Sequence, residues 1–100
     1  MIVVNTETVS GREIRETLGI CKGNTVRARN FESDILAGLK NFIGGEVEEY
    51  TKLLDSARDQ ANARMVKMAK EMGADAIVNV RYTTSNIMQG CSEILAYGTA

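Results

Sequence analysis

The longest hydrophobic pattern in the chain repeats every three or four residues. It runs from Glu46 to Met72 without a glycine or a proline. This spacing lines up apolar side chains on one face of an α-helix. The main row consists of Val47, Tyr50, Leu54, Ala57, Ala61, Met65, Met68 and Met72, and a weaker row of Leu53, Ala63, Val66 and Ala69 widens it. The pattern predicts one long helix, ended by Gly73.

A shorter pattern of the same period precedes this helix. Its apolar positions are Phe31, Ile35, Leu36, Leu39, Phe42 and Ile43. Asn30 or Ser33 could cap the first turn, and Gly44 follows the last apolar residue, where a left-handed residue commonly ends a helix. The pattern predicts a short helix that ends at Gly44.

Gly44 and Gly45 could instead belong to a loop that holds a ligand. Phosphate-binding loops follow a strand and carry further motif residues. Here a helix is expected before the pair, and Glu46, Glu48 and Glu49 follow it. These carboxylates complement the positive end of the next helix and would repel a phosphate. We therefore interpret the pair as a joint between two helices.

Patterns of period two lie before the helices. The β-branched run from Ile2 to Asn5 predicts a short strand. From Ile14 to Ala28 apolar and polar residues alternate, and the pair Gly23-Asn24 interrupts the alternation. This pair could form a hairpin turn, or a bulge that bends one long strand, and the shortness of the second run favours the bulge.

Two more alternating runs follow the long helix. Residues 76–83 and 91–97 alternate in the same way, and a short loop separates them. This arrangement predicts an antiparallel hairpin. The order of elements indicates an α+β domain in which one short and one long helix pack on one face of an antiparallel sheet.

The length of the second helix bears on assembly. At about 1.5 Å per residue, the run from Glu46 to Met72 makes a rod of roughly 40 Å. A compact domain of this size is only roughly 34 Å across, as its expected radius of gyration indicates. Part of the apolar stripe would therefore lack a core to pack on, and we expect other copies of the chain to cover it.

Composition and charge exclude several classes of partner. A length of 100 residues with 44% apolar and 25% charged residues is typical of a single globular domain, residues 1–100. The net charge of −1 supplies no general attraction for nucleic acid or an anionic membrane. No apolar run approaches the roughly 20 residues that span a bilayer, and the N-terminus does not resemble a secretory signal. We expect a cytoplasmic protein that binds neither nucleic acid nor membrane.

The two cysteines, Cys21 and Cys91, are the candidate metal ligands. They stand about seventy positions apart, neither lies in a CxxC pair, and the chain has no histidine. Two thiols are too few for a closed zinc site within one chain. Symmetry-related copies could still contribute one thiolate each. The competing interpretation, which we favour, is that both are reduced, buried, structural cysteines.

Two other clusters have simpler explanations than ligand binding. Met65, Met68 and Met72 could offer thioethers to a soft ion, but they lie on the main apolar stripe, which favours packing. Lys22, Arg27 and Arg29 could contact phosphate, but no aromatic residue stands among them for base stacking, and charged residues often protect strand edges. Without histidine or a nucleophile motif, we expect no enzymatic activity.

Four segments of the chain, taken together, resemble the sequences of a known family. "GICKG", "LKNFIGGEVEEYTKLL", "GADAIVNVRYTTS" and "EILAYGTA" are similar to the YbjQ-like family of small bacterial and archaeal proteins, often labelled heavy-metal-binding. The similarity covers essentially the whole chain. It implies a dodecin-like α+β subunit in a ring-shaped homopentamer, and it supports one bent strand around Gly23 rather than a hairpin.

The resemblance adds two functional expectations. The first is an oligomeric protein of undefined role that binds a ligand, or acts structurally, where its subunits meet. The second is a heavy-metal-binding protein with a thiolate and carboxylate site between subunits, for which Cys21 and Cys91 are the metal candidates. The cofactor stays unidentified, with a transition metal as the candidate that the label implies.

Overall fold

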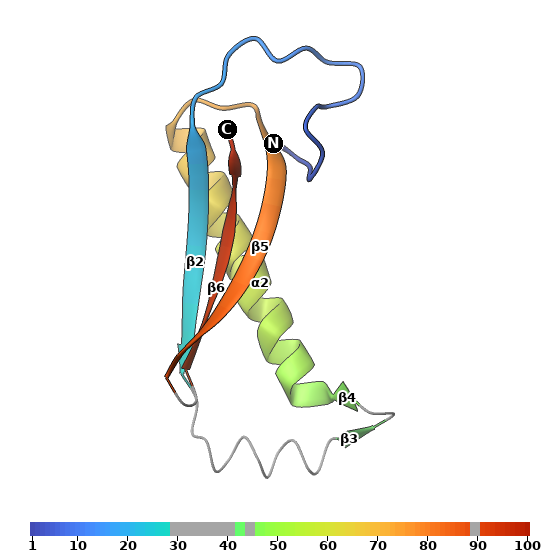
Figure 1. Ribbon diagram of the computed structural model, residues 1–100, viewed down its shortest axis with the longest axis vertical. Helices are drawn as coiled ribbons and strands as arrows, with labels where there is room; N and C mark the ends of the chain where they lie inside the picture. The colour runs from blue at the N-terminus through green and yellow to red at the C-terminus, as the bar shows by residue number, and fades with distance from the viewer. Residues whose placement is uncertain (29–41, 44–45, 89–90) are drawn as a thin grey trace.

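The computed structural model describes residues 1–28, 42–43, 46–88 and 91–100 (Figure 1). One long helix packs against one face of a curled sheet. The elements are β1 (Ile2–Val3), β2 (Ile20–Ala28), β3 (Phe42–Ile43), β4 (Glu46–Val47), α2 (Glu48–Glu71), β5 (Ala76–Met88) and β6 (Cys91–Thr99). The α+β class expected from the sequence is confirmed.

The sheet is mixed, so the expectation of an antiparallel sheet is wrong at one edge. Its strand order is β1-β5-β6-β2. The pairs β5–β6 and β2–β6 are antiparallel, which confirms the C-terminal hairpin, but β1 runs parallel to β5, with Ile2 opposite Ala76. Parallel pairing arises because the long connection through β2 and α2 returns β5 alongside β1 in the same direction.

Helix α2 confirms the long helical pattern and begins two residues later than expected. Its C-terminus is closed by two backbone bonds: Ala74 N–H donates to Ala69 O at 3.0 Å, and Gly73 N–H donates to Lys70 O at 3.0 Å. Gly73 has a φ of 86°. This is the double hydrogen bond with a left-handed glycine that commonly ends helices. The predicted role of Gly73 is therefore confirmed.

The structure corrects the end of the expected short helix. Residues 29–41, Gly44 and Gly45 lie outside the described residues, and so do most of that helix and the proposed glycine joint. Phe42 and Ile43 are not helical, however. They form β3, which pairs antiparallel with β4, and Phe42 lies opposite Val47. The sequence pattern placed Phe42 and Ile43 in a helix, whereas they form a strand, because a short apolar group fits either the helical or the strand repeat.

Strand β2 passes through Gly23 and Asn24 without a hairpin or a bulge. Its register with β6 is continuous from Ile20 opposite Thr99 to Ala28 opposite Cys91. The hairpin interpretation is therefore wrong. The single strand, which the other local interpretation and the family resemblance share, is correct, but it has no bulge at this pair. A side chain at Gly23 would collide with the backbone of Ala61 and Met65, because α2 comes very close to β2 there.

The irregularities lie instead in β5. Its register with β6 shifts between Val78 and Arg81 and again between Asn86 and Met88. At the first shift Asn79 has a φ of 54°, a left-handed conformation that asparagine tolerates better than most residues. The shift lets both Ile77 and Val80 enter the core, although they are three residues apart.

Candidate functional sites: a buried thiol, an open sheet face and an N-terminal arm

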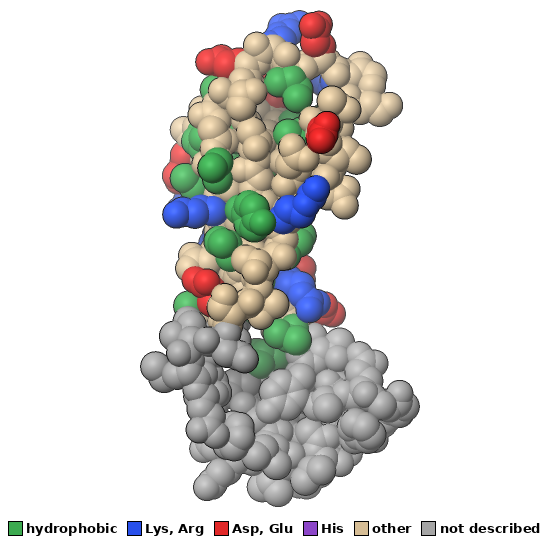
Figure 2. Space-filling view, viewed as in Figure 1, with side chains coloured by type: hydrophobic (Ala, Val, Ile, Leu, Met, Phe, Trp, Pro, Cys, Tyr) green, Lys and Arg blue, Asp and Glu red, His purple; other side chains and the backbone are tan. Residues whose placement is uncertain are grey.

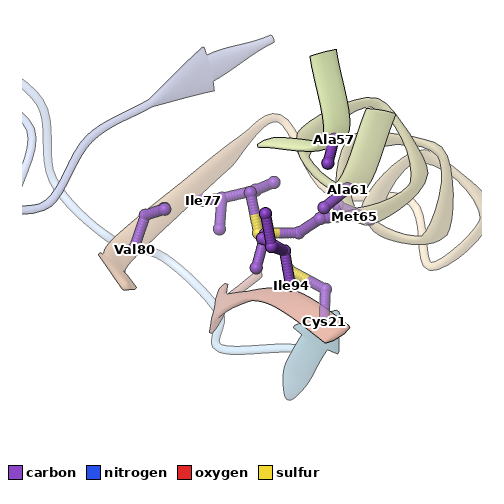
Figure 3. Close-up of a cluster of buried hydrophobic side chains, with 9 residues drawn as sticks. Cys21, Ala57, Ala61, Met65, Ile77, Val80 and Ile94 are labelled. Atoms are coloured by element: carbon purple, nitrogen blue, oxygen red, sulfur yellow. The ribbon is translucent and has the colours of Figure 1, made fainter. Parts of the chain in front are cut away.

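Cys21 lies in the core between α2 and the sheet. Figure 3 shows it among Ile77 and Ile94 from the sheet and Met65 from α2, with the side chains directed toward one another. Cys21 is fully buried, and its Sγ donates to Gly98 O at 3.8 Å. Desolvation by burial raises the pKa of the thiol, although a backbone hydrogen bond partly opposes this. Cys21 is therefore a neutral core thiol rather than an exposed thiolate.

The two cysteines lie far apart on the same ladder. Cys21 is opposite Gly98, whereas Cys91 is opposite Ala28, seven positions further along β2. At about 3.3 Å per residue, the two backbones are roughly 23 Å apart. One ion cannot contact both cysteines of one chain, and they cannot form an intrachain disulfide, which needs Cα atoms within about 7 Å. The side chain of Cys91 lies outside the described part of the chain.

The described residues contain no group of three or more Cys, Asp or Glu side chains that could hold a metal ion. Cys21 faces core residues, and the carboxylates of α2 are on its solvent side, where Arg58 pairs with Asp55 at 3.4 Å and Lys67 with Glu71 at 4.0 Å. The assignment of Cys21 and Cys91 as metal ligands stays a prediction. Met65 is fully buried in the core, as expected for packing.

The sheet face opposite α2, which we call the open face, has no covering layer among the described residues. In Figure 1 α2 lies behind the sheet, and the open face is toward the viewer. The open face carries Ile20, Lys22, Asn24 and Val26 of β2, Glu93, Leu95 and Tyr97 of β6, and Arg81, Thr83 and Ser85 of β5. Ile20 is 71% exposed, Val26 51% and Tyr97 39%.

Charged and apolar side chains alternate across this face. The register places Lys22 and Arg81 on either side of Tyr97. Further along the strands, Asn24 Nδ2 donates diagonally to Glu93 Oε2 at 3.2 Å, since Asn24 is opposite Leu95 and Glu93 is opposite Val26. Figure 2, drawn from this side, shows hydrophobic side chains bordered by Lys and Arg. Such a mixture of apolar and polar groups is typical of an interaction surface rather than of a buried core.

Residues 7–17, which we call the N-terminal arm, arch away from the end of the sheet (Figure 1). The arm is fixed at both ends: Asn79 N–H donates to Thr6 O at 2.9 Å, and Leu18 N–H donates to Ala100 O at 2.9 Å. Between these anchors it encloses a groove of about 880 Å³, lined on the opposite side by residues 72–76. The expected strand therefore starts only at Ile20, and residues 12–19 are not part of the sheet.

Sequence reasoning identified the cysteines but missed the open face and the arm. The alternation in β2 and β6 showed two faces, yet it gave no sign that the described residues would leave one uncovered. The alternation of Ile14, Glu16 and Leu18 was assigned to β2 itself. The sequence predicted that Lys22, Arg27 and Arg29 protect a strand edge. Lys22 is exposed on the edge strand β2, as this requires, but the side chains of Arg27 and Arg29 lie outside the described residues.

Comparison with known proteins decides the family. The YbjQ_1 family model, described as "Putative heavy-metal-binding", matches residues 1–100. The chain belongs to the YbjQ family. A UPF0145 protein of Archaeoglobus fulgidus is 60% identical over 100 residues, covering 100% of this chain and 93% of the relative. A UPF0145 protein of Dehalococcoides mccartyi is 56% identical, covering 100% and 96%.

A solved structure supports the fold of this YbjQ-family chain. It is the crystal structure of a protein of unknown function from Pediococcus pentosaceus, assigned to the DUF74 family. The two chains superpose with a TM-score of 0.68 at 15% sequence identity, over 100% of this chain and 94% of the other. In the described part of this chain, no helix is both long and apolar enough to cross a membrane.

Proposed function

We propose that the protein is a homo-oligomer, a pentamer with dodecin-like subunits, that binds a ligand or acts structurally where its copies meet. The observation that carries this proposal is the open face. Ile20, Val26 and Tyr97 remain exposed there, whereas α2 covers the other face of the same strands. Apolar side chains that stay exposed on a sheet face with no covering layer favour its use as a contact surface.

The shape of the chain also supports assembly. Its principal extents are 52 × 27 × 16 Å. A layer only 16 Å thick is one sheet and one helix deep, so the sheet is buried on a single side. Stacking or closing several such layers around an axis would cover the second side. The ring size of five rests on the family resemblance alone.

The proposal also covers the compartment of the protein, its partners and the absence of catalysis. Cys21 is a free thiol, as is usual in a reducing compartment such as the cytoplasm. The open face combines cationic Lys22 and Arg81 with the carboxylate of Glu93, so it has no uniform charge to attract nucleic acid or membrane lipids. We propose a binding or structural role without catalysis.

Native mass spectrometry at micromolar concentration tests the oligomer. The wild type should give one oligomeric species, and Ile20→Ser combined with Tyr97→Ser should shift it toward monomer, because both changes remove apolar area from the open face. Lys70→Ser, on the solvent side of α2, is the matched control and should leave the oligomer unchanged. A monomeric wild-type protein would overturn the proposal.

Heavy-metal binding is the second candidate, favoured by the description of the matching family. The ligands would be thiolates and carboxylates from several copies, since the two cysteines of one chain are too far apart to share an ion. Native mass spectra with and without Zn²⁺, Cu⁺ or Ni²⁺ would report uptake. Loss of uptake in Cys91→Ser or Cys21→Ser supports this function, and unchanged uptake in both variants means that the thiolate site is wrong.

A further inference from the structure

The two outer edges of the sheet are protected to different degrees. On β2, the α2 side chains cover the edge: Arg64 Nη1 donates to Asn24 O at 2.6 Å, and Lys22 N–H points to Met68 Sδ at 3.4 Å. On β5, the N-terminal segment covers the edge only as far as Val80, whose N–H donates to Val4 O at 3.1 Å. Beyond Val80, no described strand pairs with this side of β5.

The uncovered stretch of β5, Arg81–Ser85, has the properties of a strand edge that needs a partner. All five residues are exposed. Because backbone groups alternate in direction along a strand, the N–H and C=O of Tyr82 and Thr84 lie on the same side as those of Val80. The stretch reads RYTTS and contains no proline; its one charged residue is Arg81, whose Nη1 donates back to Asn5 O at 2.9 Å, and the residues from Tyr82 to Ser85 carry none of the charges that usually prevent edge pairing.

The N-terminal arm offers a segment of matching length. In residues 13–17, no backbone N–H or C=O takes part in a hydrogen bond within the described structure. Residues 13–17 of the arm read EIRET and contain no glycine or proline, and their one apolar side chain, Ile14, is 49% exposed. Its own anchors, at Thr6 and Leu18, hold it beyond the end of the sheet, away from the uncovered stretch of its own β5.

We propose that residues 13–17 of one copy pair as an added strand with the Arg81–Ser85 edge of β5 in a second copy. This inference rests on the proposed function, because it requires assembly. Adding a strand would satisfy the outward backbone groups of Tyr82 and Thr84 and those of the arm together.

Side chains support the same pairing. Tyr82 lies opposite Ala96, so its ring is on the helix side of the sheet, where its hydroxyl donates to Asn62 Oδ1 at 3.0 Å. Despite this bond to α2, Tyr82 is still 51% exposed. An added strand would bring Ile14 beside Tyr82 and cover both apolar surfaces. The contact joins two different surfaces of the chain, so repeated copies can close into a ring.

Proline substitutions test the pairing, because proline removes the N–H donor. Thr84→Pro removes an outward N–H without removing a bond between β5 and β6, and Thr84→Val is the matched control that keeps the donor. Ile14→Pro combined with Arg15→Pro removes donors on both sides of the arm, with Ile14→Val and Arg15→Lys as its control. Native mass spectrometry should show loss of the oligomer in both proline variants and in neither control.

Hydrogen exchange on the wild-type oligomer tests the pairing independently of how the variants fold. The amides of Tyr82 and Thr84 and alternate amides in residues 13–17 should exchange at least an order of magnitude more slowly than in diluted, dissociated protein. Fast exchange at these amides in the oligomer would overturn the inference. So would an intact oligomer in both proline variants, although the proposed oligomer would then stand. Loss of assembly in Thr84→Pro alone would exclude the arm as the partner.

Discussion

The two faces of the sheet are formed by the same strands and differ in what lies over them. On the helix side, Cys21, Thr25, Ile94 and Ala96 are at most 3% exposed. On the open face, one residue away along the same strands, Ile20 is 71% exposed. Alternation along a strand therefore assigns each residue to a face, whereas the role of that face depends on the neighbouring layer. We expect the covered face to carry folding stability and the open face to carry assembly.

The largest loss of stability should come from truncating Met65 of α2, the largest fully buried side chain, which packs on the covered face. Met65→Ala leaves a cavity between α2 and the sheet, and it should lower the free energy of unfolding by about 3 kcal/mol. Urea denaturation at one fixed protein concentration measures the loss. Lys67→Ala, on the exposed side of the same helix, is the control and should change stability by less than about 0.5 kcal/mol. Equal effects would mean that α2 does not pack as described.

Adding a single methyl group at the closest approach of the two layers should have the next largest effect. In Gly23→Ala the new Cβ would overlap the backbone of Ala61 and Met65 and lie 2.7 Å from the Cβ of Arg64. The helix must move away, at a cost of about 2 kcal/mol. Lys22→Ala, on the open face of the same strand, should be nearly neutral. Thermal unfolding that is unchanged in Gly23→Ala would contradict the close approach.

Removing a buried hydrogen bond should cost less. Thr25 is 2% exposed, and its Oγ1 donates to Ala57 O at 3.2 Å. Thr25→Val keeps the shape and removes the donor, and we expect a loss of about 1 kcal/mol. Thr83→Val, on the open face of β5, provides the exposed counterpart. If both variants unfold at the same urea concentration, the bond to the helix contributes nothing.

On the open face the effect on unfolding should be smaller still. Val26→Ser should change the free energy of unfolding of the dissociated chain by less than about 0.5 kcal/mol, because the side chain is half-exposed already. The same change should weaken self-association, which analytical ultracentrifugation over a dilution series can measure. If Val26→Ser lowers the free energy of unfolding and leaves self-association unchanged, the roles assigned to the two faces are wrong.

The smallest expected effect concerns the titration of Cys21. Burial raises the pKa of its thiol, so the folded chain retains the proton at a pH where the unfolded chain has lost it. The resulting stabilisation is complete below the ordinary thiol pKa of 9.0 and declines as the pH rises above that value. Urea midpoints between pH 7.5 and 10 should fall less in Cys21→Ala than in the wild type. If the urea midpoints of Cys21→Ala and of the wild type fall equally with pH, burial does not hinder ionisation of Cys21.

The sequence predicted the elements that have long, regular patterns with defined ends. Helix α2 has several turns of one apolar stripe, and Gly73 closes it through local hydrogen bonds. The β5–β6 hairpin has alternation and a short connection. Phe42 and Ile43 were misassigned because two apolar residues carry no period of their own, and their pairing with β4 depends on contacts that local propensity does not decide.

Features that depend on distant segments could not be predicted. The direction of β1 depends on pairing with β5, and a two-residue strand carries no signal of direction. The reason for Gly23 is the proximity of α2, which appears only when the layers pack. For the candidate sites, the sequence named Cys21 and Cys91 but not their separation, because that distance depends on the register of β2 with β6.

The position of β6 has a consequence for how the chain is made. β6 lies between β5 and β2, and it is the only described strand that pairs with β2. On the ribosome, β2 and α2 emerge long before the strand that completes their sheet. The edge of β2 that faces β6 must therefore stay unpaired until residues 91–99 have been synthesised. Such dependence on distant contacts slows folding, and it leaves an unpaired strand edge open to pairing with other chains until the sheet is complete.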